Sequence, residues 1–447
     1  MKSTDAIRAG ALCLALAIVQ SANSEDAGWP QWLGPQRDSV WRESGILEKF
    51  PEKGLEIRWR TPIGGGYSGP AVSHGKVYVT DRILANGIQK PSDQFKKDAL
   101  PGQERVLCLN ETDGSILWKH EYDCEYAISY PAGPRAAPLV ADGKVYTLGA
   151  EGNLLCLDAD KGTLVWSHDF KKDYNAKTPL WGFSSSPLLE GKNLICMVGA
   201  PEAAVVSFDK DTGKELWKNL SFVELGYSSP VVCDVGGKRE LVVWEPAAIH
   251  SLDVDTGKEI WTQVFTTQKG MVIATPRMLG DLLFVSCFFN GPMMVKVTGD
   301  KPEVAWRGNS SLESKPDKIH CVMGTPFLEN GYIYGTCSYG QLRCLKAGTG
   351  ERVWESLDYL AGKPTRWGNA FIVKNGDRFF LATELGDLIV AKLTPKGYEE
   401  ISRAHLLEPT GDAAGRPVVW SHPAFADKCV FARNDKEIVC ASLAAQK

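Results

Sequence analysis

Short apolar runs followed by polar turns recur along almost the whole chain. In the copy at residues 153–166, Leu154 to Leu157 is an apolar run suited to a buried strand, and Asp158 to Gly162 is a cluster of turn-forming residues. A second strand then leads to Trp166. The same turn glycine four residues before a tryptophan recurs at Gly114/Trp118, Gly213/Trp217, Gly257/Trp261 and Gly350/Trp354, with variants at Pro302/Trp306 and Gly397/Ile401. Regular copies of this kind predict a repeat architecture.

A second motif alternates with the first. A proline opens an apolar stretch, and a glycine then leads into a second stretch, as in Pro70 to Val72 followed by Gly75 to Val79. Each repeat therefore contains four short strands over roughly 45–50 residues, which is typical of one blade of a β-propeller. The proline stands at the start of its strand, where its missing N–H costs least.

Counting the repeats predicts the size of the ring. First strands begin at Pro70, Pro138, Pro187, Pro230, Pro276, Pro326, Ala370 and Pro423, and last strands end at residues 59, 118, 166, 217, 261, 306, 354 and 401. The two series are offset by one, because Glu56 to Ile63 precedes the first repeat and the last repeat stops near Cys440. We therefore predict an all-β, eight-bladed propeller of four-stranded antiparallel blades, closed by the N-terminal strand around Trp59.

The beginning of the chain predicts the compartment of the protein. Gly10 to Val19 is apolar but too short to span a bilayer, and small residues precede Glu25. We predict a signal peptide at residues 1–24, an irregular leader at 25–54 and a single propeller domain at 55–447. An uncleaved membrane anchor is the alternative for the first segment. The protein is expected to be exported, to the periplasm or cell envelope, with no transmembrane segment in the mature chain.

Charge excludes one class of partner. The 447 residues carry 50 Lys and Arg against 54 Asp and Glu, a formal net charge of −4. Because nucleic-acid binding draws on a basic excess, no nucleic-acid partner is predicted.

The repeat also resembles a known family. The spacing Asp-x-x-x-Gly-x-x-x-Trp at Asp158/Gly162/Trp166, Asp209/Gly213/Trp217 and Asp253/Gly257/Trp261 is similar to the tryptophan-docking motif of PQQ-like (pyrroloquinoline-quinone-like) β-propellers. That family includes quinoprotein alcohol dehydrogenases and the lipoprotein B subunit of the outer-membrane β-barrel assembly machine. The resemblance covers Leu55 to Ala445. It implies the fold rather than an activity, because the docking tryptophans join blades and contact no cofactor.

Cysteines and histidines point to no metal and no catalytic residue. Cys108, Cys156, Cys344 and Cys440 share one repeat position that is Ser or Ala in other copies, so they are expected to be small buried side chains. One disulfide is predicted, between Cys429 and Cys440 across a hairpin. The seven histidines form no pair with ligand spacing, and no adjacent cysteines occur.

The connections that enter the first strands are rich in aromatic and cationic residues and should surround one mouth of the central channel. They contain Tyr67, Tyr130, Arg135, Trp181, Phe183, Tyr227, Lys269, His320, Arg366, Trp367, Asn369, Trp420 and His422. Among these, the candidate binding residues are Arg135, Trp181, Arg366, Trp367, Asn369 and Trp420. An insertion at Asp81 to Arg105 should project from the same mouth. The alternative is that these aromatics merely plug the channel.

Three functions remain open. The first is a non-enzymatic binding or scaffold protein with a protein partner, acting in cell-envelope protein assembly as the family resemblance implies. The second is a PQQ- and calcium-dependent quinoprotein dehydrogenase, and the third is a propeller that binds carbohydrate or another small ligand. We predict the first, with no cofactor, no metal and a monomeric state.

Overall fold

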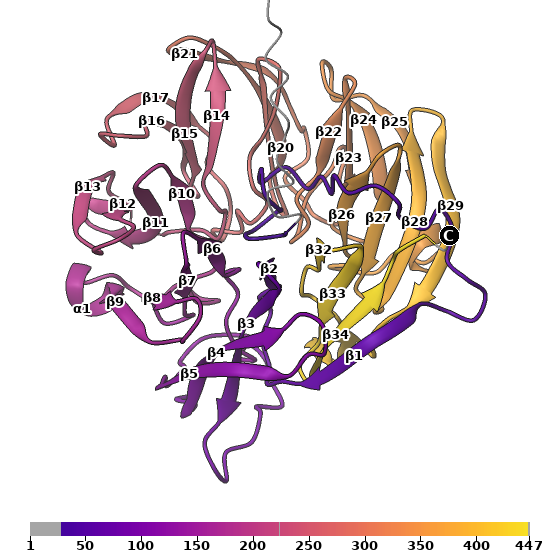
Figure 1. The fold of residues 1–447 in the computed structure, drawn as a ribbon. Helices are drawn as coiled ribbons and strands as arrows, with labels where there is room; N and C mark the ends of the chain where they lie inside the picture. Colours follow the sequence, from indigo (N-terminus) through magenta and orange to yellow (C-terminus); the bar gives the residue numbers. More distant parts are fainter. Residues whose placement is uncertain (1–27, 223, 446–447) are drawn as a thin grey trace, which may run out of the picture.

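The computed structural model describes residues 28–222 and 224–445, and the predicted signal peptide at residues 1–24 lies outside them. Eight four-stranded antiparallel sheets stand side by side in a ring (Figure 1). This arrangement confirms the predicted all-β, eight-bladed propeller.

The first four blades follow the chain in order, each beginning with its innermost strand. Blade 1 comprises β2 (Ala71–Ser73), β3 (Lys76–Leu84), β4 (Gly102–Asn110) and β5 (Ile116–Asp123); blade 2 comprises β6 (Leu139–Ala141), β7 (Lys144–Leu148), β8 (Asn153–Asp158) and β9 (Leu164–Asp169); blade 3 comprises β10 (Leu188–Glu190), β11 (Asn193–Ala200), β12 (Ala203–Asp209) and β13 (Glu215–Asn219); blade 4 comprises β14 (Val231–Val235), β15 (Lys238–Trp244), β16 (Ala248–Asp253) and β17 (Glu259–Val264).

The other four blades complete the ring. Blade 5 comprises β18 (Arg277–Leu279), β19 (Leu282–Cys287), β20 (Gly291–Thr298) and β21 (Lys301–Arg307); blade 6 comprises β22 (Phe327–Glu329), β23 (Tyr332–Thr336), β24 (Leu342–Lys346) and β25 (Arg352–Ser356); blade 7 comprises β26 (Ala370–Asn375), β27 (Arg378–Thr383), β28 (Asp387–Thr394) and β29 (Gly397–His405); blade 8 comprises β32 (Ala424–Ala426), β33 (Cys429–Arg433), β34 (Glu437–Ser442) and β1 (Glu56–Pro62).

Blade 8 closes the ring with strands from both ends of the chain. β1 pairs with β34 in antiparallel register, with Trp59 opposite Cys440. The predicted closure is therefore confirmed, and no blade is left with only three strands. The pairing covers the outer edge of β34, which would otherwise present unpaired backbone groups to solvent.

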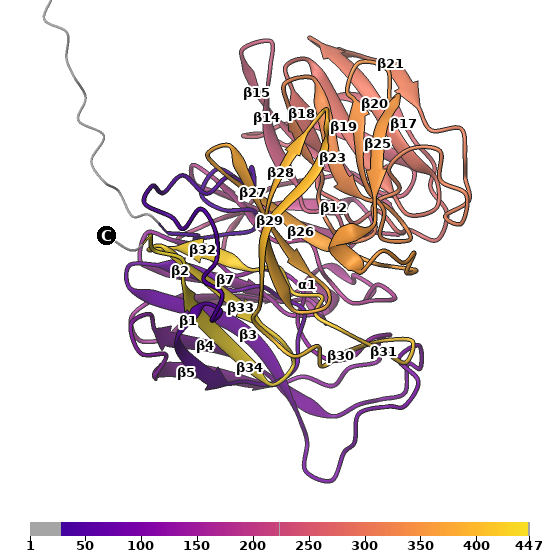
Figure 2. The ribbon, with the colours of Figure 1, turned by 90° about the vertical axis from the view of Figure 1, so that its right-hand side faces the viewer.

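Three small elements were not predicted. A short helix α1 (Phe170–Tyr174) and a 3-10 turn η1 (Asp358–Leu360) follow the outer strands of blades 2 and 6. The hairpin of β30 (Gly411–Ala413) and β31 (Arg416–Val418) lies between blades 7 and 8. In the insertion, β3 and β4 extend to Leu84 and Gly102, and the loop between them projects furthest from the ring (Figure 2).

The outer strands of neighbouring blades meet through the repeated tryptophans. The Trp166 indole N–H donates to the Lys210 carbonyl oxygen of the next blade at 3.1 Å, and a Cβ at Gly213 would lie 2.7 Å from its ring. Gly213 thus provides both a left-handed turn (φ +72°) and space for the indole. Equivalent bonds run from Trp59, Trp118, Trp217, Trp306 and Trp354 to carbonyl oxygens of the following blade.

The leader crosses one end of the channel (Figure 1), on the side of the ring opposite the insertion loop and the β30–β31 hairpin (Figure 2). Trp29 exchanges backbone hydrogen bonds with Val72 of blade 1, and Trp41 donates its backbone N–H to Lys374 of blade 7. The buried Arg37 guanidinium donates to the carbonyl oxygens of Pro187 and Pro230, ahead of blades 3 and 4. Burial lowers the pKa of Arg37 to about 9. Because the leader touches blades across the whole ring, it closes this end of the channel.

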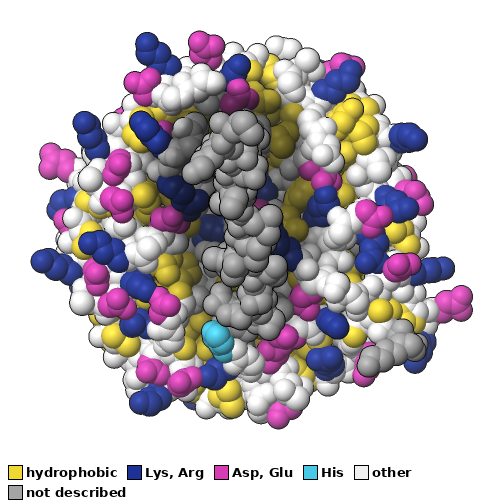
Figure 3. Space-filling view, turned by 45° about the horizontal axis from the view of Figure 1, so that its top comes forward, with side chains coloured by type: hydrophobic (Ala, Val, Ile, Leu, Met, Phe, Trp, Pro, Cys, Tyr) yellow, Lys and Arg dark blue, Asp and Glu magenta, His cyan; other side chains and the backbone are white. Residues whose placement is uncertain are grey.

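The predicted disulfide is wrong. All eleven cysteines of residues 28–222 and 224–445 are buried free thiols. Cys429 stands opposite Ser442, and Cys440 opposite Phe431, so the two are diagonal neighbours whose thiols hydrogen-bond to each other without a covalent bond. In the same described ranges, no helix is long and apolar enough to cross a membrane. On the face seen in Figure 3, acidic and basic side chains are interspersed, as the balanced composition predicts.

Candidate functional site

A cavity of about 790 Å³ lies in the centre of the ring. This volume falls within the range of ordinary ligand pockets. Its walls come mainly from the connections that enter the first strands, and its floor contains Trp32 of the leader. The indole N–H of Trp32 donates to Thr275 Oγ1 at 2.9 Å, and its ring meets His422 edge-on at 4.4 Å. The central channel is therefore a cup with one open mouth.

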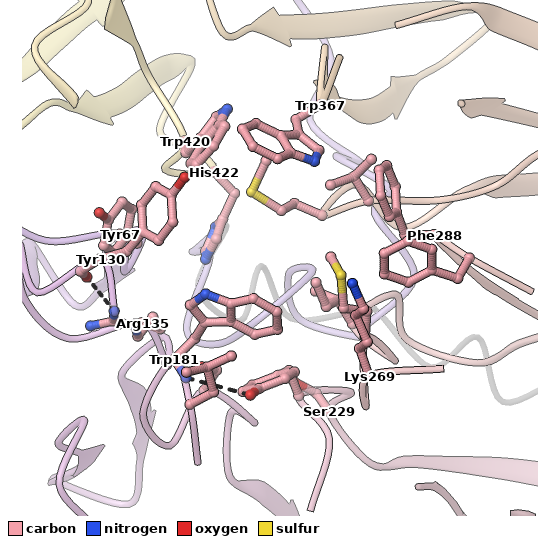
Figure 4. Close-up of a pocket in the computed structure, with 18 of the residues that line it drawn as sticks. Tyr67, Tyr130, Arg135, Trp181, Ser229, Lys269, Phe288, Trp367, Trp420 and His422 are labelled. Atoms are coloured by element: carbon pink, nitrogen blue, oxygen red, sulfur yellow. Dashed lines mark hydrogen bonds between the residues drawn. The ribbon is translucent and has the colours of Figure 1, made fainter. Parts of the chain in front are cut away.

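Aromatic side chains dominate the lining (Figure 4). Trp181 faces Trp367 and Trp420 across the cavity (Figure 4). The complete aromatic set is Trp32, Tyr67, Phe95, Tyr130, Trp181, Tyr227, Phe288, Phe289, Trp367, Phe371 and Trp420. Rings of this kind offer large, rigid contact area at a low cost in side-chain entropy.

The structure brings together five of the six candidate binding residues. Arg135, Trp181, Arg366, Trp367 and Trp420 all line the cavity, as do Tyr67, Tyr130, Tyr227, Lys269 and His422. Asn369 does not. Its side-chain oxygen is buried and accepts hydrogen bonds from the Gly324 N–H and the Thr336 hydroxyl. Phe183 and His320 are also buried in the body of the ring rather than in the lining.

The position of Asn369 reveals a repeated contact at the inner edge of the blades. The residue just before the first strand's proline accepts a backbone N–H from a neighbouring blade at Ser186, Ser229, Thr325 and His422. Asn369 occupies the same slot. The donors at these positions would otherwise be buried without partners, so the slot favours small polar side chains or histidine. Ser186, Ser229 and His422 of this belt line the cup, and the sequence signal of the belt is a polar residue just before the first strand in six of the eight blades.

The insertion contributes to the mouth as predicted. Phe95, from the loop between β3 and β4, lines the cavity and meets Tyr130 edge-on at 5.2 Å. Lys90 of the same loop lies 3.4 Å from Asp435 of blade 8. The loop therefore spans the mouth between blades 1 and 8.

Several lining residues escaped the sequence-based prediction. Phe288 and Phe289 lie in the turn between β19 and β20, not in a connection before a first strand. Trp32 comes from the leader, which the sequence predicted only to be irregular. The turns between second and third strands end at the same mouth, and that placement could have drawn attention to Phe288.

Three cations line the cavity, and two of them are already engaged. The Arg135 guanidinium donates to backbone carbonyl oxygens of Ser129, Tyr130 and Gly133. Arg366 pairs with Glu313 at 2.9 Å and lies over the Trp367 ring. The Lys269 side chain forms no hydrogen bond or ion pair with any described residue, and its ammonium group lies 5.1 Å from the centre of the Phe289 ring.

A buried ion pair supports one wall. Glu384 accepts bonds from the Arg416 guanidinium on the β30–β31 hairpin and from the Trp420 indole N–H at 3.2 Å. Arg416 also donates to the Arg366 carbonyl oxygen at 3.1 Å. Burial raises the pKa of Glu384, against the opposing effect of Arg416. The hairpin thus positions both Trp420 and Arg366.

Three large residues of the mouth have a strained backbone. Tyr130, Lys269 and Trp367 adopt positive φ angles of 55°, 57° and 64°. Bulky residues rarely adopt this left-handed conformation, and its cost is retained most often at functional sites. Each of these three side chains is turned into the cavity lining.

The lining does not fit a calcium-bound quinone cofactor. Calcium takes six to eight oxygen ligands, usually with several carboxylates. Glu224 is the one carboxylate among the described residues of the lining. Over residues 28–222 and 224–445, no group of three or more His, Cys, Asp or Glu residues could hold a metal ion.

Comparisons with known proteins agree with this architecture. The family model described as outer membrane protein assembly factor BamB matches residues 102–356. Among solved structures, BamB from Moraxella catarrhalis is 15% identical, with a TM-score of 0.51 over 83% of this chain and 99% of that one.

Two further structures share the fold. A quinohemoprotein alcohol dehydrogenase from Pseudomonas putida HK5 is 13% identical, with a TM-score of 0.58 over 95% of this chain and 81% of that one. The computationally designed Ika8 protein is 10% identical, with a TM-score of 0.53 over 87% and 99%. No curated protein sequence matches this chain. At these identities the structural likeness concerns the fold alone.

Proposed function

This chain belongs to the PQQ-like propeller family described as outer membrane protein assembly factor BamB, and we propose that it is a non-enzymatic protein-binding propeller of the cell envelope. The partner rests on the mouth of the ring and inserts a segment into the cup. Its proposed role is to hold that partner during assembly of envelope proteins.

The observation that carries this proposal is the continuity of the cup with an apolar rim. Phe95 and Leu180 both line the cavity, yet they remain 48% and 42% exposed. A ligand small enough to sit inside the cup would leave these side chains in water. A protein partner would cover them while filling the cavity, and aromatic anchors in such pockets typically dominate binding energy.

The test is crosslinking from the native envelope with a photoreactive amino acid at Phe95. We expect one specific partner, identified by mass spectrometry, and no such product from a probe at the outer-edge residue Leu117, which is equally exposed at 48%. The double variant Trp181→Ala/Trp367→Ala should lose the product with little change in melting temperature. If these rings only plug the channel, the variant would instead melt at a clearly lower temperature and still crosslink.

A PQQ-dependent dehydrogenase is the enzymatic alternative. It is tested by adding PQQ and Ca²⁺ to the purified protein and measuring alcohol-dependent dye reduction. Activity abolished by Trp181→Ala would replace the binding proposal with the enzymatic one. A carbohydrate ligand is tested in the same preparation by tryptophan fluorescence against oligosaccharides, because four tryptophans line the cup.

A further inference from the structure

We infer that the segment entering the cup is acidic: it carries an aspartate or glutamate beside a large aromatic or aliphatic side chain, and its carboxylate binds Lys269. This inference rests on the proposed protein-binding function and specifies the chemistry of the partner. It follows from which charged groups of the lining are free.

The cavity holds more positive than negative charge. Its lining contains Arg135, Lys269 and Arg366 against Glu224. Glu313 compensates Arg366 through the ion pair described above. Glu224 lies against Gly270 but forms no ion pair with Lys269, so an excess of cations remains among the described lining residues.

Of the three cations, Lys269 is the one able to accept a new partner. Arg135 uses its guanidinium to organise the loop that carries Tyr130, and Arg366 is held by Glu313 and the Trp367 ring. The Lys269 ammonium group points toward the middle of the cavity (Figure 4). The positive φ angles of Lys269 and Gly270 turn the backbone so that this side chain faces inward.

The apolar surroundings favour a charged partner that brings its own apolar group. Aromatic walls lower the local dielectric constant, which strengthens the attraction between Lys269 and a carboxylate once the cup is filled. A bare acid would leave Trp181, Trp367 and Trp420 uncovered. A segment with an acidic residue next to a large apolar one satisfies both the cation and the facing rings.

The experiment is a selection of random linear heptapeptides displayed on phage against the full-length protein. We expect the recovered peptides to be enriched in Asp or Glu adjacent to Trp, Tyr, Phe or Leu. Selection against Lys269→Gln should lose the acidic preference and keep the apolar one. The matched control Lys363→Gln removes an exposed lysine from the connection that carries Arg366 but lies outside the lining, and it should behave like the wild type.

One selected peptide then gives the quantitative test. Replacing its acidic residue with the amide should weaken binding to the wild type about tenfold and should not change binding to Lys269→Gln. Affinity for the wild type should also fall as salt is added.

Recovery of peptides with no acidic preference, or a preference that survives Lys269→Gln, would overturn the inference while leaving the Phe95 crosslink and the proposed function intact. Binding of N-acetyltryptophan without recovery of any peptide would also overturn it, in favour of a small aromatic acid. Loss of the Phe95 crosslink in the native envelope would instead reject the proposed function itself.

Discussion

The outer seams of the ring and its central mouth use the same aromatic residue types for different purposes. At most outer seams the tryptophan meets a glycine and a backbone carbonyl oxygen of the next blade, as Trp166 meets Gly213 and Lys210. At the mouth, Trp181 and Trp367 come from connections of different length and face an open cavity. The acceptors for six of the seven seam tryptophans are backbone carbonyl oxygens of the next blade, whereas the mouth has no repeated contact for its rings.

The one exception among the seam tryptophans reinforces this contrast. Trp261 of blade 4 donates to the Glu240 carboxylate of its own blade, not to blade 5. Blade 5 has Pro302 four residues before its tryptophan, where most other blades have the turn glycine, and among the described residues the Trp261 indole N–H bonds only to Glu240. A buried carboxylate supplies the acceptor instead. The seam thus depends on the turn of the following blade as much as on the tryptophan itself.

Among changes at the outer seams, loss of ring closure should have the largest effect on stability. Deleting residues up to Pro62 removes β1 and exposes the edge of β34, and we expect the protein to aggregate or unfold. Size-exclusion chromatography and thermal melting measure the outcome. A truncated protein that stays monomeric with an unchanged melting temperature would contradict the role assigned to β1.

Removing one tryptophan side chain from each region should have the next largest effect and should distinguish the seams from the mouth. Trp166→Ala is expected to lower the free energy of unfolding by about 3–5 kcal/mol, because it empties a docked site between blades 2 and 3. Trp181→Ala should cost less than about 1 kcal/mol, since its ring faces an open cavity. Denaturant unfolding of both variants measures the difference. Equal losses would mean that the mouth is packed like a seam.

The glycine half of the seam can be tested with a matched control. Gly213→Ala should cost about 2 kcal/mol more than Gly191→Ala. Both glycines have positive φ angles, but a Cβ at Gly213 would strike the Trp166 ring, whereas a Cβ at Gly191 meets nothing within 4 Å. The difference between the two variants therefore isolates the contact with the indole. Its absence would show that Gly213 serves the turn alone.

The smallest effect on stability is expected from His422 in the inner belt, and it depends on pH. Burial lowers the pKa of His422 to about 4, while the unfolded chain keeps an ordinary value near 6.5. Between these values the unfolded state binds more protons, so stability is lost as pH falls from about 6.5 toward 4. From about pH 7 to 5.5 this loss is about 1 kcal/mol.

The variant His422→Gln supplies the reference for that loss, because its amide oxygen can still accept the Gly69 N–H. The stability gap between wild type and variant should shrink as pH falls, as followed by denaturant unfolding at each pH. A gap that stays constant would mean that His422 titrates normally in the folded protein.

Much of the fold could be predicted from the sequence, because the information is local and repeated. The glycine before each tryptophan, the proline before each first strand and the offset between the two series predicted eight blades and closure by β1. The β30–β31 hairpin was missed because it is unique, and a single short segment has no repeat to support it. The hairpin spacing correctly brought the thiols of Cys429 and Cys440 into contact, but spacing alone does not establish that a covalent bridge forms.

The sequence by itself determined the ring: its periodic apolar strands can be buried only by stacking neighbouring blades, and its turn residues set where each strand ends. It also indicated which connections are rich in aromatic and cationic residues. Only the tertiary structure decided what they enclose. Closing the ring brought Trp32, Phe95 and Phe288 from three different kinds of segment into one lining, and buried Asn369 in a hydrogen-bonded belt. Whether a side chain enters a cavity or a seam depends on residues far away in sequence, and therefore no local pattern could distinguish them.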